Sequence, residues 1–102
     1  MRGEPESVHI ISRKKLKEAA AKHPSLGTAL DTWFRVAKKA RWRNLSEVRK
    51  TYPTADPVGP YTVFNIKGNR FRLVAEIIYE RGRIYIRHVL THAEYDKGKW
   101  KL

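Results

Sequence analysis

The sequence predicts an α+β domain in which N-terminal helices pack on a C-terminal antiparallel β-sheet. Apolar residues recur at helical spacing up to about residue 40, whereas β-branched and aromatic runs separated by glycine turns follow from Tyr61 onwards. A chain of 102 residues has room for one hydrophobic core. We therefore expect one domain over residues 8–102, preceded by a flexible extension over residues 1–7.

The first half predicts one short strand and three helices. After a strand over 8–11, Ser12 is expected to cap a helix that ends near His23, where Pro24 follows. The second helix is expected over 26–40, because its apolar residues form one stripe: Leu26, Ala29, Leu30, Trp33, Phe34 and Ala37. Ser46 is expected to cap a third helix that ends near Lys50.

The second half predicts an antiparallel meander. Residues 51–60 contain three prolines and one glycine, so we expect a loop there. Strands are expected over 61–66, 71–79 and 83–90, with tight turns at 67–69 and 80–82. Thr91 and Glu94 have the spacing of a capping box and predict a short terminal helix. The lysine-rich end, 97–102, is expected to fray.

The charge indicates a polyanionic partner. Lysine and arginine number 22 against 10 aspartate and glutamate, a net charge of +12. A surface that is merely well solvated would need far less excess positive charge. The field of this chain therefore favours a polyanion such as nucleic acid. No cysteine is present, so disulfides and thiolate metal sites are excluded, which fits a cytoplasmic location. No run of apolar residues suits a membrane span or a secretory signal.

Cations and titratable groups gather on the predicted sheet and at its C-terminal exit. Arg70, Arg72 and Glu76 are expected on one face of the middle strand, since alternate side chains share a face. Arg87 and His88 end the last strand, and His92 and Tyr95 follow it. Phosphodiester cleavage through the ribose 2′-OH needs a base, an acid and fixed cations, which are the residue types found here. That reaction needs no metal, and no cofactor motif is present.

Each of these residues also has an ordinary structural interpretation. Arg72 can balance Glu76 on a solvated face, and His88 can be a satisfied core histidine. Trp42 can stack on a base, but packing against the end of the second helix is the favoured interpretation. His88 and His92 are four residues apart, yet they fall on different elements, which disfavours a metal site. The residues by themselves therefore support RNA binding better than cleavage.

Three segments in order resemble a known family. They are VHIISRKKLKEAA at 8–20, YTVFNIKGNRFRLVAEIIYERGRIYIRHVL at 61–90 and THAEYDKGKW at 91–100. The chain resembles the HigB-type toxins of type II toxin–antitoxin systems, within the RelE-like group of mRNA interferases. The resemblance implies the RelE-like microbial RNase fold and an endoribonuclease without a cofactor. It implies cleavage of mRNA in the ribosomal A site by 2′-OH attack, with contacts to 16S rRNA.

The resemblance also implies a partner and residue roles. The partner is a helix-turn-helix antitoxin of HigA type, through which alone the toxin contacts operator DNA. The catalytic residues implied are Arg72 for the phosphate, His92 and Tyr95 for proton transfer or orientation, and Asp96 to orient His92. The remaining candidates for RNA binding are Asn65, Lys67, Arg70, Arg87, Lys38, Lys39, Arg41 and Arg43.

The general base stays open between two residues. RelE itself places lysines on the strand before Arg72, where this chain has Val63 and Asn65. His92 is therefore the first candidate and Lys67 the second. A non-catalytic RNA- or ribosome-binding module is the alternative function. A DNA-binding accessory protein is disfavoured, because no connection between the helices reads as a helix-turn-helix.

Overall fold

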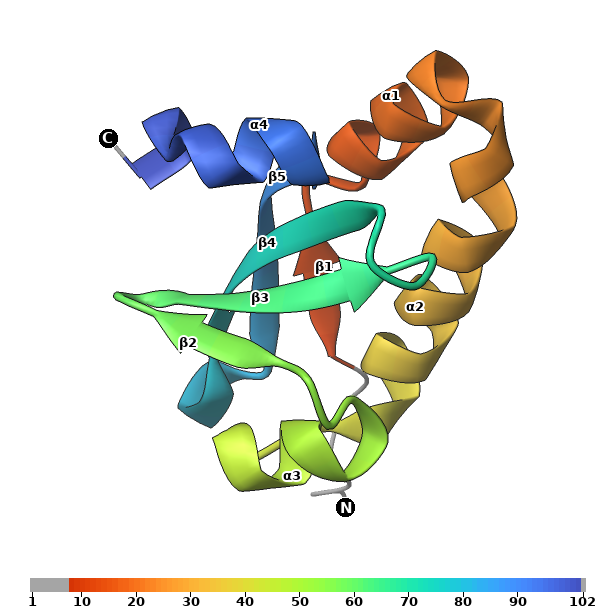
Figure 1. Ribbon diagram of the computed structural model, residues 1–102. Helices are drawn as coiled ribbons and strands as arrows, with labels where there is room; N and C mark the ends of the chain where they lie inside the picture. Colours follow the sequence, from red (N-terminus) through yellow and green to blue (C-terminus); the bar gives the residue numbers. More distant parts are fainter. Residues whose placement is uncertain (1–7, 102) are drawn as a thin grey trace.

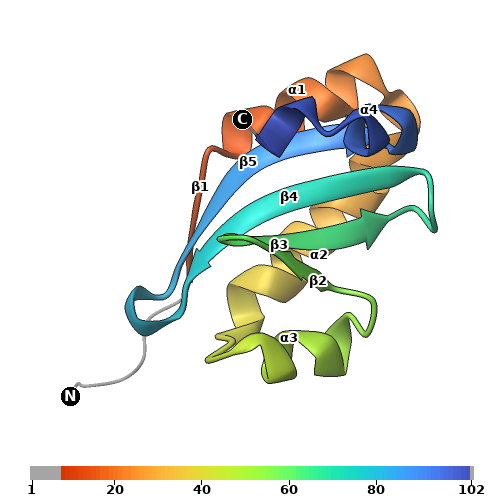
Figure 2. The same cartoon turned by 60° about the vertical axis from the view of Figure 1, so that its left-hand side comes forward.

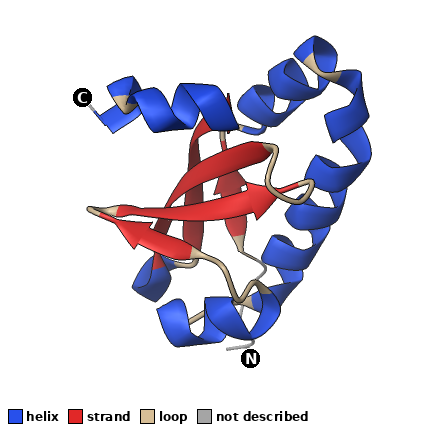
Figure 3. Cartoon of the chain, viewed as in Figure 1, coloured by secondary structure: helices blue, strands red, loops and turns tan. Residues whose placement is uncertain are grey.

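The computed structural model describes residues 8–101, so the extension expected over residues 1–7 lies outside the described residues. Figures 1 and 3 show how the helices and strands are arranged. In chain order the elements are β1 His9–Ile11, α1 Arg13–Lys22, α2 Gly27–Ala40, α3 Leu45–Thr51, β2 Asp56–Val58, β3 Tyr61–Ile66, β4 Phe71–Ile78, β5 Arg83–Thr91 and α4 His92–Lys97. Short 3₁₀ turns occupy Pro24–Leu26, Tyr79–Arg81 and Lys99–Lys101.

The five strands form one mixed sheet in the order β1-β5-β4-β3-β2. The meander from β2 to β5 is antiparallel, as expected, but β1 pairs parallel to β5, with His9 opposite Arg83. The expected antiparallel C-terminal sheet is confirmed, whereas the place and direction of the first strand in it were not predicted. Local turns predict the direction of neighbouring strands in a meander, but they carry no information about a strand that returns from far along the chain.

The loop expected over residues 51–60 contains a strand. Residues Asp56–Val58 form β2 and pair with β3, with Pro57 opposite Thr62. A proline has no backbone N–H to donate, which argues against a central strand but is compatible with an edge strand. β2 lies at the edge of the sheet, where a proline is tolerated.

The main core lies between one face of the sheet and the helices α1, α2 and α3 (Figures 1 and 2). The stripe predicted on α2 faces this core, where Leu26, Leu30, Trp33 and Ala37 are buried. Trp42 is also buried, and its ring stacks on Phe64 at 5.9 Å between centroids. The structural interpretation of Trp42 is therefore confirmed, and the base-stacking one is wrong.

A second, smaller core lies on the opposite face of the sheet. Trp100 packs there against Val63 and Val74, with Tyr61 and Tyr95 at its margin. The expectation that residues 97–102 fray was wrong for the described part of that segment. Lys99–Lys101 forms a turn because the indole of Trp100 covers apolar strand residues that would otherwise face water.

Two of the three helix caps expected from the sequence differ from those in the structure. Ser12 has a left-handed backbone, with φ of 75°, and its side chain makes no capping hydrogen bond to α1. Ser46 lies inside α3, whose cap is Asn44: its Oδ1 accepts from the Glu47 backbone N–H at 3.0 Å. Asparagine caps a helix as well as serine does, so both Asn44 and Ser46 were possible caps, and the structure uses Asn44. The capping box of Thr91 and Glu94 at α4 is confirmed.

None of the helices in the described part of the chain is long and apolar enough to cross a membrane.

Candidate active site beside helix α4

Arg72 projects from β4 on the face of the sheet that carries the Trp100 cluster, because it alternates with Leu73 and shares a face with Val74. Its guanidinium donates to the Asn69 side-chain oxygen at 2.8 Å and to the Asn69 backbone carbonyl at 3.2 Å. A further bond reaches the carbonyl of Phe71 at 3.3 Å. The turn before β4 therefore fixes a planar cation whose remaining N–H groups are available to a ligand.

Tyr95 lies next to this cation. The Cζ atom of Arg72 is 5.5 Å from the centroid of the Tyr95 ring, within the range of a cation–π contact. Burial raises the pKa of the Tyr95 phenol, and the carboxylates of Asp56 and Asp96 act in the same direction, while Arg72 opposes them. The phenol therefore keeps its proton near neutral pH.

His92 and Asp96 form a pair on one face of α4. Nδ1 of His92 lies 2.9 Å from Oδ2 of Asp96, one helical turn apart. A carboxylate that accepts the Nδ1 proton leaves Nε2 as the unprotonated, acceptor nitrogen of a neutral imidazole. The backbone N–H of His92 also donates to the carbonyl of Arg70 at 2.9 Å. This bond ties the start of α4 to the turn that holds Arg72.

A bulge in β5 places two further polar side chains on the same face. Val74 pairs with His88 and Ala75 with Ile86, so Arg87 is an extra residue on β5. The Arg87 guanidinium donates twice to Oε1 of Glu76, at 2.8 and 3.1 Å. The structural alternative in which Glu76 balances Arg72 was therefore wrong, because the bulge turns Arg87 towards Glu76 instead.

His88 is half-buried beside Trp100, with 6.3 Å between their ring centroids. Burial lowers the pKa of its imidazole, and the positive charges of Lys15 and Arg87 lower it further. The histidine is therefore neutral at physiological pH. Its environment is that of a packed histidine that is bonded to the backbone of Trp100, in line with the structural interpretation of this residue.

The other sequence candidates on the sheet lie in different surroundings. Asn65 is paired with Arg72 in register, and its side-chain amide donates to Thr54 Oγ1 at 3.3 Å. Arg70 is exposed in the turn before β4, so the expectation that it shares a strand face with Arg72 was wrong. Lys67 Nζ donates to the carbonyl of Ser25, next to the start of α2. That bond points Lys67 towards the helical layer.

The basic residues of α2 form a separate group. Lys38 and Lys39 lie in the last turn of α2, and Arg41 and Arg43 follow it beside α3. Figure 1 shows this end of α2 next to α3, at the far side of the molecule from α4. All four are exposed, and Arg43 also lies 3.9 Å from the carboxylate of Glu47. The structure thus separates these four cations from Arg72.

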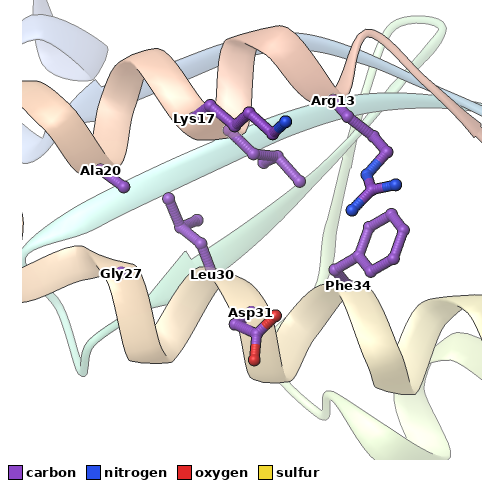
Figure 4. A pocket seen from close by; sticks show the side chains of 8 residues that line it. Arg13, Lys17, Ala20, Gly27, Leu30, Asp31 and Phe34 are labelled. Carbon is purple, nitrogen blue, oxygen red and sulfur yellow. The ribbon is translucent and has the colours of Figure 1, made fainter.

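A shallow groove between α1 and α2 lies apart from both groups. Figure 4 shows its apolar floor, with Leu30 and Phe34 from α2, and the Arg13 guanidinium 4.3 Å from the Phe34 ring centroid. None of the candidate catalytic residues lines it. Over residues 8–101, no three His, Cys, Asp or Glu side chains are grouped so that they could hold a metal ion.

Comparison with known proteins decides the family. Residues 27–98 match the family model described as the RelE-like toxic component of a toxin–antitoxin system. The chain belongs to the HigB toxin family. It is 35% identical over 92 residues to the mRNA interferase toxin HigB of Escherichia coli K12, covering 87% of this chain and 88% of that protein. It is 33% identical over 93 residues to the mRNA interferase HigB of Escherichia coli O6:H1, covering 88% and 90%.

The range 27–98 that matches the HigB family model spans Arg72, His92, Tyr95 and Asp96. Sequence reasoning missed two residues that hold them. Asn69 was assigned only to a turn, although an asparagine before a strand arginine is able to bond it. Trp100 was assigned to a fraying end, although a lone tryptophan among lysines signals a buried anchor.

Proposed function

We propose that this protein is the toxin of a type II toxin–antitoxin module and cuts mRNA in the ribosomal A site. The observation that carries the proposal is the assembly of Arg72, Tyr95 and the His92–Asp96 pair around the start of α4. It provides a fixed cation, a protonated phenol and an oriented imidazole, the three groups that 2′-OH attack requires. The names of the relatives, mRNA interferase HigB, support the same substrate.

In the proposed reaction, Nε2 of His92 removes the proton of the ribose 2′-OH, and Asp96 holds the ring by Nδ1. The 2′ oxygen attacks phosphorus, and the bond to the 5′ oxygen breaks. Arg72 stabilises the negative charge of the phosphorane, and Tyr95 supplies the proton to the 5′ oxygen. The products are a 2′,3′-cyclic phosphate and a 5′-hydroxyl, and no metal ion takes part.

His92 is favoured over Lys67 as the base. The bond from Lys67 to Ser25 directs that ammonium to the helical side of the sheet, whereas His92 lies on the element that carries Tyr95. On β3 the residues that share the face of Arg72 are Tyr61, Val63 and Asn65, none of which is a lysine or a histidine. With so few groups for proton transfer, we propose that the ribosome orients the mRNA and that the toxin requires it.

We further propose the cellular partners. A helix-turn-helix antitoxin of HigA type neutralises the toxin in the cytoplasm, and operator DNA is bound only through that antitoxin. The exposed cations at the end of α2 supply docking contacts to 16S rRNA, since phosphate contacts carry affinity without sequence selection.

The deciding experiment is expression of the toxin without its antitoxin. We expect growth arrest and mRNA cut inside translated reading frames. Arg72→Ala and His92→Gln are expected to abolish cutting while ribosome binding and the circular dichroism spectrum persist. Arg81→Ala is the matched control, because it removes an exposed arginine far from α4. Intact transcripts together with ribosome binding by the wild-type protein would instead establish the non-catalytic binding module.

The chemistry of the cut is tested by its ends. A 2′-deoxynucleotide at the cut position of a programmed mRNA is expected to block cleavage, and the downstream fragment is expected to carry a 5′-hydroxyl. A 5′-phosphate on that fragment would contradict attack by the 2′-OH and indicate an activated water.

A further inference from the structure

Trp100 lies in the turn Lys99–Lys101, beyond the residues 27–98 that the family model matches. Its side chain is 6% exposed and packs on Val63 and Val74 of the sheet. The indole also stacks on Tyr95, with 5.0 Å between ring centroids and 18° between planes. A residue near the end of the chain therefore contacts the proposed proton donor directly.

A hydrogen bond fixes the orientation of this indole. Its Nε1–H donates to the backbone carbonyl of Tyr95 at 2.9 Å. The indole N–H groups of the other two tryptophans, Trp33 and Trp42, are buried without a partner. Since a buried N–H normally has an acceptor, the bond at Trp100 distinguishes an oriented ring from one held by packing alone.

The contacts continue from Trp100 to the phosphate-binding group. Trp100 stacks on the Tyr95 ring, and the guanidinium of Arg72 lies 5.5 Å from the centroid of that ring. The turn residue Asn69 holds Arg72 from the other direction. Displacement of the Tyr95 ring would consequently change the position of this proposed proton donor and also the environment of the Arg72 guanidinium.

We propose that Trp100 is a positioning residue for cleavage: it fixes the Tyr95 ring, and through that ring the guanidinium of Arg72, in the geometry that the phosphate requires. This inference rests on the proposed function, because it assigns Trp100 to that same site. Misplacement of a catalytic group by about 1 Å can cost about 100-fold in rate, so a support of this kind affects turnover more than substrate binding.

Two variants separate positioning from simple burial. Trp100→Leu keeps apolar cover and removes the ring and the N–H, whereas Trp100→Phe keeps a ring that can stack on Tyr95. Trp42→Leu is the matched control, since Trp42 is 7% exposed in the other core and also stacks on an aromatic ring. All are assayed on ribosomes stalled with one A-site codon, at a temperature where circular dichroism shows them folded.

We expect kcat of Trp100→Leu to fall about 10-fold, with KM changed less than about 2-fold. Trp100→Phe is expected to keep at least about one third of wild-type kcat, because edge and face contacts between rings persist. Trp42→Leu is expected to keep its kcat per folded molecule. In a Tyr95→Ala background, adding Trp100→Leu is expected to lower kcat by less than about 2-fold. The effects of two residues that act through one another are not additive.

A second readout is independent of cleavage. The NMR signal of the Arg72 Nε–H senses the Tyr95 ring, and we expect Trp100→Leu, but not Trp42→Leu, to move it towards the position of a free arginine. An unchanged signal together with unchanged kcat in Trp100→Leu overturns the inference, as do fully additive losses with Tyr95→Ala. If the wild-type toxin cuts no RNA, the proposed function fails, while a selective shift of the Arg72 signal still establishes that Trp100 positions the pair.

Discussion

Arg72 illustrates how the fold orders a side chain that we propose as the phosphate-binding group. Three hydrogen bonds to Asn69 and Phe71 hold its guanidinium before any ligand arrives. A cation that is already ordered loses less conformational entropy on binding and needs no rearrangement in the transition state. The planar fork is essential to this arrangement, because an ammonium group cannot donate in several fixed directions of one plane.

At this scale we expect Arg72→Lys to be nearly as harmful as Arg72→Ala. The cleavage rate on ribosomes should fall about 100-fold or more in both, as when one fixed donor to a developing anion is removed. Ribosome affinity, measured by sedimentation, should change little because most docking charge lies elsewhere. A lysine variant with near wild-type turnover would show that charge alone suffices.

His88 leads to a prediction about stability and pH. Burial lowers its pKa in the folded protein below the ordinary 6.5. The unfolded chain therefore binds more protons as the pH falls through about 6.5, and the free energy of unfolding decreases below that pH. Above that pH, the contribution of neutral His88 to the free energy of unfolding is fully present.

We expect denaturant titrations of wild type to show a loss of stability between about pH 7 and pH 5 that is smaller in His88→Gln. His9→Gln is the control, since His9 is an exposed histidine of β1. Equal slopes for the two variants would place the pH dependence elsewhere.

Residue chemistry was predictable where it depended on local spacing. His92 and Asp96 are four residues apart, so a helix over that segment predicts their contact. The partner of Glu76 was not predictable, because the bulge at Arg87 breaks the alternation that the sequence suggests. Trp100 was missed for a related reason: most of its apolar neighbours come from β3 and β4, which are distant in the sequence.

Among the elements, α4 is the one on which the candidate site depends. It carries His92, Tyr95 and Asp96 on six residues, too few to form a stable helix alone. The capping box at Thr91 and Glu94 begins it, and the bond from Thr91 N–H to the Glu94 carboxylate lowers the pKa of Glu94. Gly98 ends it with φ of 74°, a conformation that a side chain would strain.

We expect Thr91→Ala to cost about 1 kcal/mol of unfolding free energy and to reduce cleavage beyond that loss of folded protein. The first turn of α4 holds His92, so fraying there should reduce turnover directly. Asn44→Ala removes the equivalent cap of α3 and is the control. The two variants should lose similar free energy of unfolding, but Thr91→Ala should cleave more slowly than Asn44→Ala. Equal cleavage rates would contradict the dependence of the site on α4.

Most elements were predicted because their signals are local: the α2 stripe, the turns beside β4, and the capping box of α4. β2 was missed because Pro57 and its neighbours have the composition of a loop, and only pairing with β3 makes them a strand. The direction of β1 was missed because it is set by a partner more than 70 residues away.

Over the whole molecule, two groups of positive charge have different expected roles. Arg72 and Arg87 lie on the sheet face with α4, whereas Lys38, Lys39 and Arg41 lie at the end of α2. Long-range attraction to rRNA depends on the number of neutralised phosphates and not on the exact geometry.

We expect the double variant Lys38→Ala, Lys39→Ala to weaken ribosome binding and to lower the slope of log affinity against log salt by about 1 to 2. The single-turnover rate of the bound complex should stay within about 2-fold of wild type, because neither residue contacts the α4 assembly. Lys14→Ala, Lys17→Ala is a control of equal charge on α1. A slower single-turnover rate would place the α2 lysines in the chemistry.

The pairing of β1 with β5 bears on the synthesis of the toxin. His9 lies opposite Arg83 in the sheet, and its backbone N–H donates to the carbonyl of Gly82 at 2.9 Å, although more than 70 residues of the chain separate these positions. Such distant contacts form late, because the intervening chain must first be available. The sheet is completed only after β5 has emerged, and α4 with His92 and Tyr95 emerges later still. Under the proposed function, we therefore expect a nascent chain to cut no mRNA until β5 and α4 have both emerged.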